Sequence, residues 1–264
     1  MEAVAIATLI SWALIAFLGV HALFSKECST RLELRYFRFY KRELFDILHV
    51  GIPTGVQMGL YSIANVIITS TVNSYGKAAT TGISIANQFD GILYNICHAT
   101  SLAVLPYVSQ NVGAKNIARA KKSIWHGILI TVAIGGFFGA LSAIFSPQLS
   151  SLMSSDPQVI AYSCEKMIII SSTYFICGIN DIIGAAVRGM GRPMLATATT
   201  LIYMCALRFF WVYVMFPLCP NFTFLYLVWP VGWVLSLITL LFFLFPTAKR
   251  LGKRFAEAKE AVTE

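Results

Sequence analysis

Residues 209–248 read FFWVYVMFPLCPNFTFLYLVWPVGWVLSLITLLFFLFPTA and contain no Asp, Glu, Lys or Arg. A helix needs about 20 apolar residues to cross the hydrocarbon core of a bilayer, so this stretch is long enough to cross twice. Three more charge-free stretches, residues 3–25, 47–76 and 123–155, are each long enough to cross once. The pattern predicts an all-α integral membrane protein.

The composition excludes a soluble globular domain. Of the 264 residues, 57% are hydrophobic and 12% are charged, about half the charged fraction of a typical soluble domain. The mean hydropathy is +0.72. The six cysteines form no C-x-x-C pair and most lie in apolar stretches, so neither disulfides nor a metal site is expected.

Turn signals between the apolar stretches predict seven transmembrane helices. They are expected at about 3–24, 48–74, 79–109, 123–145, 160–187, 194–216 and 223–246. This organisation divides the chain into a lone helix in residues 1–24, an interfacial linker in 25–46, a six-helix lobe in 47–248 and a basic tail in 249–264.

The basic residues predict the orientation of these helices. Of the 20 lysines and arginines, 17 fall in the linker, after the third helix, after the fifth helix and in the tail. Cytoplasmic loops carry the excess of such residues, which places the C-terminus in the cytoplasm and the N-terminus outside in a cell membrane, inner or plasma. Weak attraction to lipid headgroups accounts for the charge, and no nucleic-acid partner is expected.

Two basic residues lie within or beside the apolar segments. Lys166 follows Glu165, and this pair is expected to mark the outer boundary of the fifth helix. Arg208 is then the only basic residue deep in a segment; it either pairs with a buried acid or extends toward the membrane surface.

Polar residues recur every three or four positions on three of the predicted helices. They are Thr54, Gln57, Tyr61, Asn65 and Thr69 on the second, Asn87, Asp90, Tyr94 and His98 on the third, and Thr173, Cys177, Asn180, Asp181, Gly184 and Arg188 on the fifth. This spacing confines each set to one helical face, which must contact protein or water because lipid cannot satisfy it. Such a face either lines a polar cavity or forms hydrogen bonds between helices.

Asp90 and Asp181 are the two acids well inside apolar segments. An isolated charge there is costly, so a buried carboxyl is protonated or paired. Each therefore has either a role in binding a proton or cation or a structural hydrogen bond.

Small residues recur four apart on the predicted second, third and fourth helices. They are Gly51, Gly55 and Gly59, then Ala78, Gly82 and Ala86, then Gly135 and Gly139. This spacing lets helices approach closely in lipid, so these positions are expected to be packing contacts.

The sequence shows no phosphate-binding loop, nucleophile elbow or zinc-protease motif. No catalytic residues are therefore assigned, and the chain is not expected to be an enzyme. A polar-lined helical bundle in lipid favours transport.

Three stretches resemble the multidrug and toxic compound extrusion (MATE) transporter family. Gly51-Ile52-Pro53 opens the second helix, as in the first helix of that family's C-terminal lobe. Residues 108–114, VSQNVGA, resemble the signature that ends the next helix, and residues 186–191, AVRGMG, resemble the turn two helices later. Asp90 and Arg208 stand where many members keep an aspartate and an arginine.

The resemblance implies a secondary antiporter of two six-helix lobes. Such a protein exports organic, often cationic, compounds in exchange for protons or sodium ions and needs no other cofactor. By this resemblance, the chain is expected to hold the C-terminal lobe and the last helix of the N-terminal lobe. The family's substrate cavity lies between the two lobes, so the rest of the N-terminal lobe would have to come from a longer chain or from another subunit.

Together, the stripes and the resemblance predict the site residues. Asp90 and Asp181 are the candidate binders of the coupling ion. The predicted lining of the substrate cavity is Gln57, Tyr61, Asn65, Asn87, Tyr94, Asn180 and Arg208. Tyr61 stands about where some sodium-coupled members carry a glutamate, which weakens a sodium assignment. Gln88 replaces the basic residue that often lies two positions before the aspartate.

Two alternatives remain open at this point. A flippase for lipid-linked precursors has a related helical plan, and several Arg and Lys in the groove would favour it. A non-transporting fragment or structural subunit is the other.

Overall fold

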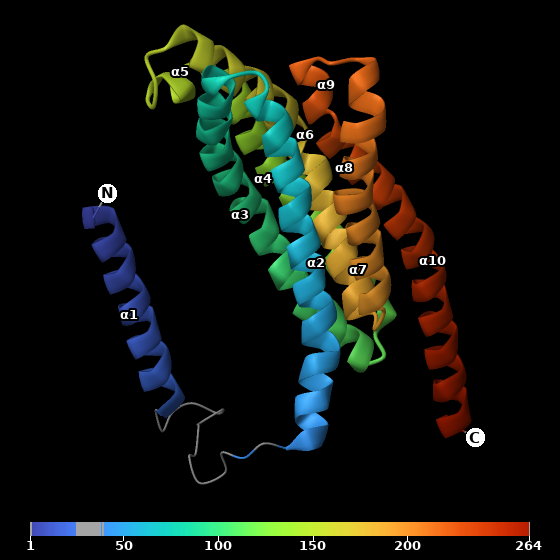
Figure 1. The fold of residues 1–264 in the computed structure, drawn as a ribbon. Helices are drawn as coiled ribbons and strands as arrows, with labels where there is room; N and C mark the ends of the chain where they lie inside the picture. The colour runs from blue at the N-terminus through green and yellow to red at the C-terminus, as the bar shows by residue number, and fades with distance from the viewer. Residues whose placement is uncertain (1, 25–37, 39, 264) are drawn as a thin grey trace. The chain divides into compact units, whose positions relative to one another are not determined.

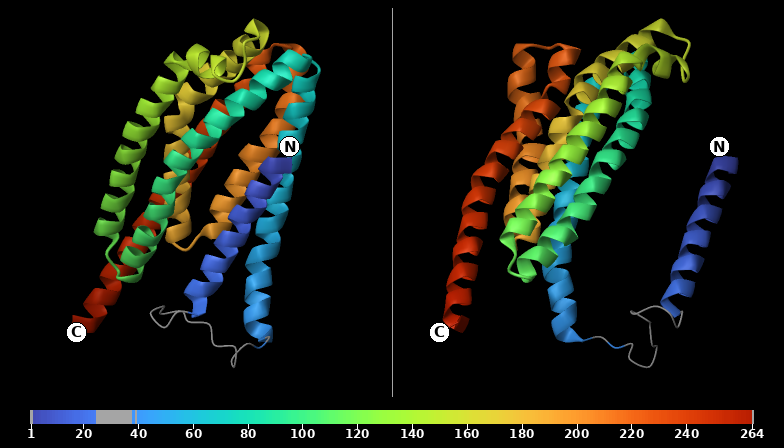
Figure 2. Two further views of the ribbon diagram at one scale, coloured as in Figure 1. Left: turned by 90° about the vertical axis from the view of Figure 1, so that its left-hand side faces the viewer. Right: turned by 180° about the vertical axis from the view of Figure 1, so that it is seen from behind.

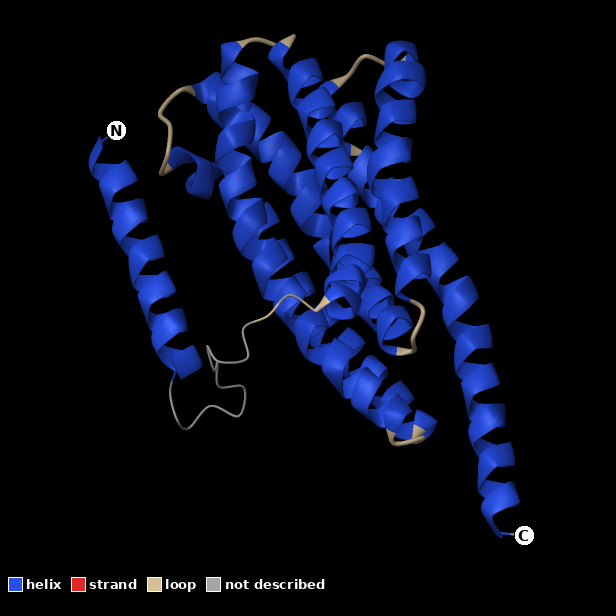
Figure 3. Cartoon of the chain, turned by 60° about the horizontal axis from the view of Figure 1, so that its bottom comes forward, coloured by secondary structure: helices blue, strands red, loops and turns tan. Residues whose placement is uncertain are grey.

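The computed structural model describes residues 2–24, 38 and 40–263, and every regular element in that part of the chain is a helix (Figure 3). The chain divides into two compact units, Met1–Thr54 and Gly55–Glu264, which are considered separately. The first unit contains α1 (Glu2–Phe24) and the start of α2 (Lys41–Asn73). Most of the predicted linker lies outside the described residues, but its last six residues belong to α2.

The second unit contains the rest of α2 and the helices that follow it. Its α-helices are α3 (Lys77–Gly113), α4 (Ile117–Ile144), α5 (Ser146–Ser151), α6 (Pro157–Gly189), α7 (Pro193–Leu201), α8 (Leu207–Phe210), α9 (Phe222–Tyr226) and α10 (Val228–Thr263). Two π-helical turns, η2 (Ile202–Ala206) and η3 (Trp211–Met215), flank α8, and a 3₁₀ turn, η4 (Phe216–Leu218), follows.

Within the described residues, five helical segments are long and apolar enough to cross a membrane. They are Lys77–Gly113, Ile117–Ile144, Pro157–Gly189, Pro193–Leu218 and Phe222–Ala256. These segments confirm a multi-pass helical membrane protein, whereas the count of seven spans stays a prediction.

Several helices extend beyond their predicted ends. The helix α4 begins at Ile117 rather than at residue 123, and α10 continues through the basic tail to Thr263. The absence of charge marks the part of a helix that lies in lipid, but backbone hydrogen bonding continues into water. At the start of α4, the side chain of Asn116 caps the helix by accepting a hydrogen bond from the backbone N–H of Arg119 at 3.0 Å.

The helix α6 is the centre of the second unit. The side chain of Asp156 caps the start of α6 by accepting a hydrogen bond from the backbone N–H of Gln158 at 2.9 Å, and Pro157 occupies the first helical position. It contacts α3, α4, α5, α7, α9 and α10 (Figures 1 and 2). It is also the most buried of the five segments, so its polar side chains face protein or a cavity rather than lipid.

Glycines allow α6 to approach α3 and α4 closely. A Cβ atom at Gly82 would lie 2.5 Å from the carbonyl oxygen of Val159, and one at Gly139 would clash with the carbonyl oxygen of Ser171. The predicted packing role is confirmed at both positions. A Cβ at Gly55 or Gly59, by contrast, would meet no atom within 4 Å, so the structure shows no packing contact at these two positions.

The turns of the second unit gather at two ends. Gly76 and Gly191 have φ angles of 93° and 81°, which confirms the turns predicted there. The turns after α3 and α6 lie toward the end where α10 terminates, and α5, α9 and the α2–α3 turn lie at the opposite end (Figure 1). This arrangement groups the basic turns with the basic tail, as the predicted orientation requires.

Candidate functional site

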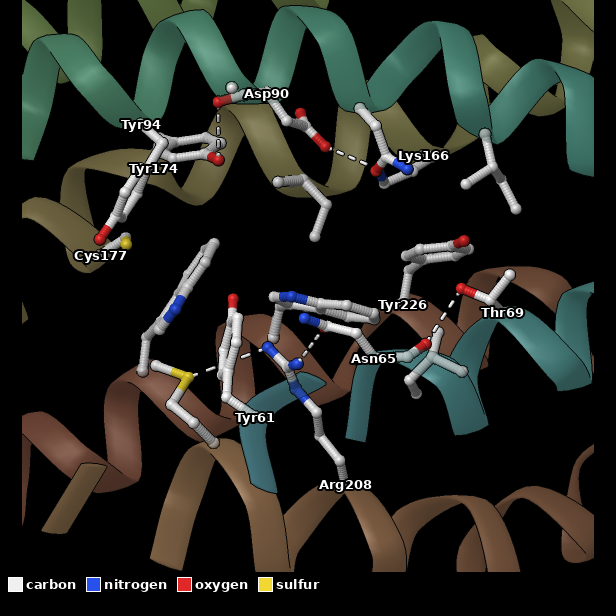
Figure 4. Close-up of a pocket in the computed structure, with 18 of the residues that line it drawn as sticks. Tyr61, Asn65, Thr69, Asp90, Tyr94, Lys166, Tyr174, Cys177, Arg208 and Tyr226 are labelled. Atoms are coloured by element: carbon white, nitrogen blue, oxygen red, sulfur yellow. Dashed lines mark hydrogen bonds and ion pairs between the residues drawn. The ribbon is translucent and has the colours of Figure 1, made fainter. Parts of the chain in front are cut away.

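A cavity of about 570 Å³ lies between α2, α3, α6, α8 and α10 in the second unit. Its charged lining residues are Asp90, Lys166, Asp181 and Arg208, and its aromatic lining residues are Tyr61, Tyr94, Tyr174, Tyr226, Trp229 and Trp233. Figure 4 shows Asp90 and Lys166 on one side of the cavity and Arg208 with Asn65 and Tyr61 on the facing side. The cavity therefore has two walls, which differ in how their charges are compensated.

The first wall holds a buried ion pair between α3 and α6. Nζ of Lys166 lies 2.7 Å from Oδ2 of Asp90, and the two side chains are 5% and 13% exposed. The same ammonium group donates to the side-chain oxygen of Asn87, and the hydroxyl of Tyr174 donates to the backbone carbonyl of Asp90 at 3.1 Å. Oδ1 of Asp90 is buried with no hydrogen-bond partner among the described atoms, so the carboxylate has free accepting capacity.

The expectation that Lys166 marks the boundary of its helix is wrong. The helix α6 begins nine residues earlier, at Pro157, and Lys166 is 4% exposed. Arg208 is therefore not the only basic residue deep in a segment. Lys166 is tolerated there because Asp90 compensates its charge and Asn87 accepts a further hydrogen bond.

The second wall is organised around Arg208 on α8. Its Nη1 donates to the side-chain oxygen of Asn65 at 2.6 Å. Its guanidinium carbon lies 5.0 Å from the ring centroid of Tyr61 and 4.7 Å from that of Trp229. Arg208 thus donates a hydrogen bond to an amide and makes cation–π contacts with two aromatic rings, and it pairs with neither buried acid. Two π-helical turns flank α8, and such turns are frequent at functional sites in proteins.

The second acid has a different partner. Oδ2 of Asp181 lies 3.2 Å from Nδ1 of His98, and the ring of Tyr94 stacks on the imidazole with centroids 5.1 Å apart. The side chains of His98 and Asp181 are 34% and 24% exposed, so this pair is more open than that of Asp90. The neighbouring Asn180 is buried, and its side-chain oxygen has no partner among the described atoms.

The structure brings most of the predicted site residues into one cavity. Both acids line it, together with Tyr61, Asn65, Asn87, Tyr94, Asn180 and Arg208. The side chain of Gln57 lies outside the described residues. What these residues do toward a substrate or an ion stays a prediction.

Sequence reasoning missed Lys166 on the first wall and Trp229 on the second. A signal for Lys166 was present, because it precedes Thr173 by two helical turns and so continues the polar stripe of α6. The position of Trp229 had no comparable signal, because residues 209–248 contain no charged residue and no polar stripe that includes it.

A membrane-spanning helical bundle with a charged, aromatic-lined cavity is the architecture of a transporter. The model of the MatE family matches residues 53–214. The chain therefore belongs to the MatE family, whose members are transporters and not enzymes.

Curated relatives carry multidrug resistance and other transport names. The chain is 28% identical to the probable multidrug resistance protein YoeA of Bacillus subtilis over 63% of its own length and 36% of the relative. It is 24% identical to an FAD transporter of Shewanella oneidensis over 78% of its own length and 45% of the relative. The chain thus spans about a third to a half of these relatives.

Solved structures show the same fold. An outward-facing multidrug resistance MATE transporter of the MOP superfamily matches 94% of this chain and 56% of its own, with a TM-score of 0.79 and 18% identity. A MOP superfamily transporter from Pyrococcus furiosus matches with a TM-score of 0.75 and 18% identity, covering 94% of this chain and 55% of its own. The fold of the predicted MATE-type lobe is confirmed.

Proposed function

We propose that this chain forms the C-terminal half of a secondary antiporter that exports organic compounds in exchange for protons or sodium ions. The observation that carries the proposal is the charged cavity, because all four charged side chains that line it lie in apolar membrane segments. Buried ionisable groups of this kind mark substrate and ion pathways.

Asp90 is the proposed coupling carboxylate. It is bound to Lys166 at 2.7 Å through one oxygen, while the other oxygen has no partner among the described groups. Binding of a proton or sodium ion at Asp90 would weaken its attraction to Lys166, so ion binding would change the charge of the first wall. Tyr61, which adds no carboxylate to the cavity, favours a proton over sodium. Asp181, already paired with His98, is the second candidate.

The chain would act with a second lobe. In alternating access, two repeats move against each other around a site at their interface, so one lobe supplies half of the binding surface. We place the N-terminus outside and the C-terminus in the cytoplasm of the cell membrane, and the partner lobe comes from a longer chain or another subunit.

The test compares efflux by Asp90→Asn and Asp181→Asn proteins that contain both lobes. Vesicles carrying an imposed proton gradient are loaded with a fluorescent drug, and its efflux is followed with and without the gradient. Asp90→Asn is expected to remove the dependence on the gradient, and Asp181→Asn to reduce it less. Coupling equal to that of the wild type in Asp90→Asn, at equal protein amount, would remove Asp90 from the mechanism.

A flippase for a lipid-linked precursor is the second candidate function. The observation that favours it is Lys166, which raises the number of basic residues in the cavity to two. The same vesicles distinguish the two functions, because a flippase would move a fluorescent polyprenyl phosphate between leaflets without moving the soluble drug.

A further inference from the structure

The two basic residues of the cavity are not equivalent. Lys166 has a carboxylate at 2.7 Å. Arg208 has no carboxylate within 4.0 Å in the described part of the chain, although it is only 2% exposed. Asp181 lies beyond 4.0 Å from Arg208, and its own side-chain contact is with Nδ1 of His98 at 3.2 Å.

A buried arginine without a counterion is costly, and its neighbours offset only part of that cost. Asn65 accepts one hydrogen bond, and the sulfur of Met204 accepts a long one at 3.9 Å. The remaining stabilisation comes from the faces of Tyr61 and Trp229. All of these groups are neutral, so the second wall keeps a full positive charge in a region of low dielectric.

The surface that covers this charge is aromatic. Tyr61 lies against the guanidinium and is itself 44% exposed, so a ligand in the cavity would contact its ring with the arginine behind it. Trp229 and Trp233 extend the aromatic lining along α10. Aromatic faces favour a planar ring over a saturated one of the same size.

We infer that the cavity binds planar aromatic compounds that carry a negative charge, such as aromatic carboxylates or phosphates, in preference to organic cations. The inference rests on the proposed function and specifies its substrate class. The anionic group would lie within Coulomb range of Arg208, and the ring would stack on the aromatic wall. A cation would approach an uncompensated positive charge, and no free carboxylate would face it on the second wall.

The test uses probes that differ in charge but share one ring system. The 264-residue chain is placed in lipid nanodiscs, and calorimetry measures the Kd of 1-naphthoate, 1-naphthylmethanol and 1-naphthylmethylammonium. Decalin-1-carboxylate, which keeps the anion and removes the aromatic ring, is the fourth probe. The anion is expected to bind at least about tenfold more tightly than the cation, because a charge difference at short range in low dielectric has at least that effect.

Two variants at Arg208 separate charge from structure. Arg208→Gln is expected to remove the preference for the anion, while Arg208→Lys keeps the charge and should retain the preference at weaker affinity. Arg119→Gln makes the same chemical change on an exposed residue of α4, outside the cavity, and should leave all four Kd values unchanged. Thermal melting of each variant shows which proteins are folded, and Arg208→Lys serves if Arg208→Gln is not.

The binding data distinguish failure of the inferred substrate class from failure of the proposed transport function. Equal binding of anion and cation, or tighter binding of the cation, would overturn the inference and leave the proposed transport of organic compounds standing. Equal binding of decalin-1-carboxylate would overturn the aromatic part. No binding of any probe by a folded chain would overturn both the inference and the half-cavity as a substrate site.

Discussion

Replacing Lys166 by methionine should destabilise the second unit by about 3–5 kcal/mol, because it leaves Asp90 buried without its counterion. Methionine keeps the unbranched chain but removes the charge. The 2.7 Å separation corresponds to about 6 kcal/mol of attraction at an effective dielectric constant of about 20. Removing the two ions from water costs several kcal/mol each, so the pair as a whole contributes little, yet breaking it is expensive.

The double variant Asp90→Asn, Lys166→Met tests this separation of terms. Both charges are gone, so neither is left unpaired, and the free energy of unfolding should recover most of what the Lys166→Met change loses. We expect a coupling energy of about 3 kcal/mol between the two sites, at the upper end for residues in contact. The measurement is unfolding in mixed micelles with increasing SDS, followed by tryptophan fluorescence.

Lys121→Met is the matched control, because Lys121 is exposed on α4 and the expected change is within about 0.5 kcal/mol. If Lys166→Met unfolds like the control, the ion pair is not buried in the way the structure shows. If the double variant loses as much as the two single variants together, the two residues are energetically independent and the reasoning is refuted.

Three further predictions concern packing, hydrogen bonding and topology. Gly139→Ala should cost about 1–3 kcal/mol, because the new methyl group overlaps a carbonyl of α6; Gly136→Ala, with open space around it, should not lower the melting temperature. Trp211→Phe should lower the free energy of unfolding by about 1 kcal/mol through loss of the indole bond to a backbone carbonyl in α9, and an unchanged value would contradict that bond. A cysteine at Lys77 should react with an impermeant thiol reagent only from outside and one at Lys253 only from the cytoplasm; the reverse pattern would invert the topology.

The sequence alone was enough to predict the class of fold, and eight of the nine predicted site residues line the cavity. Tyr61, Asn65 and Thr69 follow one face of α2 by helical periodicity, and all three line the cavity. Lipid cannot satisfy polar groups, so such a face must contact something else, and this constraint acts within a single helix.

The side-chain contacts between helices and the positions of the helix ends could not be predicted in the same way. Whether Arg208 contacts Asp90, Asp181 or Asn65 depends on how helices far apart in the chain pack, and single-helix periodicity does not contain that information. The π-helical turns beside α8 rotate the side chains that follow them by a fraction of a turn around the helix axis. No residue pattern in this apolar stretch predicts such turns. Helix ends were misplaced because the charge-free criterion locates lipid rather than hydrogen bonding.

The ion pair shows which sequence signals, combined, would have predicted a contact between helices. Gly82 lets α3 approach the backbone of α6 at Val159. Asp90 lies eight residues after Gly82 and Lys166 seven after Val159, so both side chains are about two turns, or roughly 11 Å, beyond the contact along their helices. The two helices are still close at that position, where Nζ of Lys166 and Oδ2 of Asp90 are 2.7 Å apart. A small-residue contact and two opposite charges at the same distance from it therefore predict a buried pair, whereas the charges alone predict none.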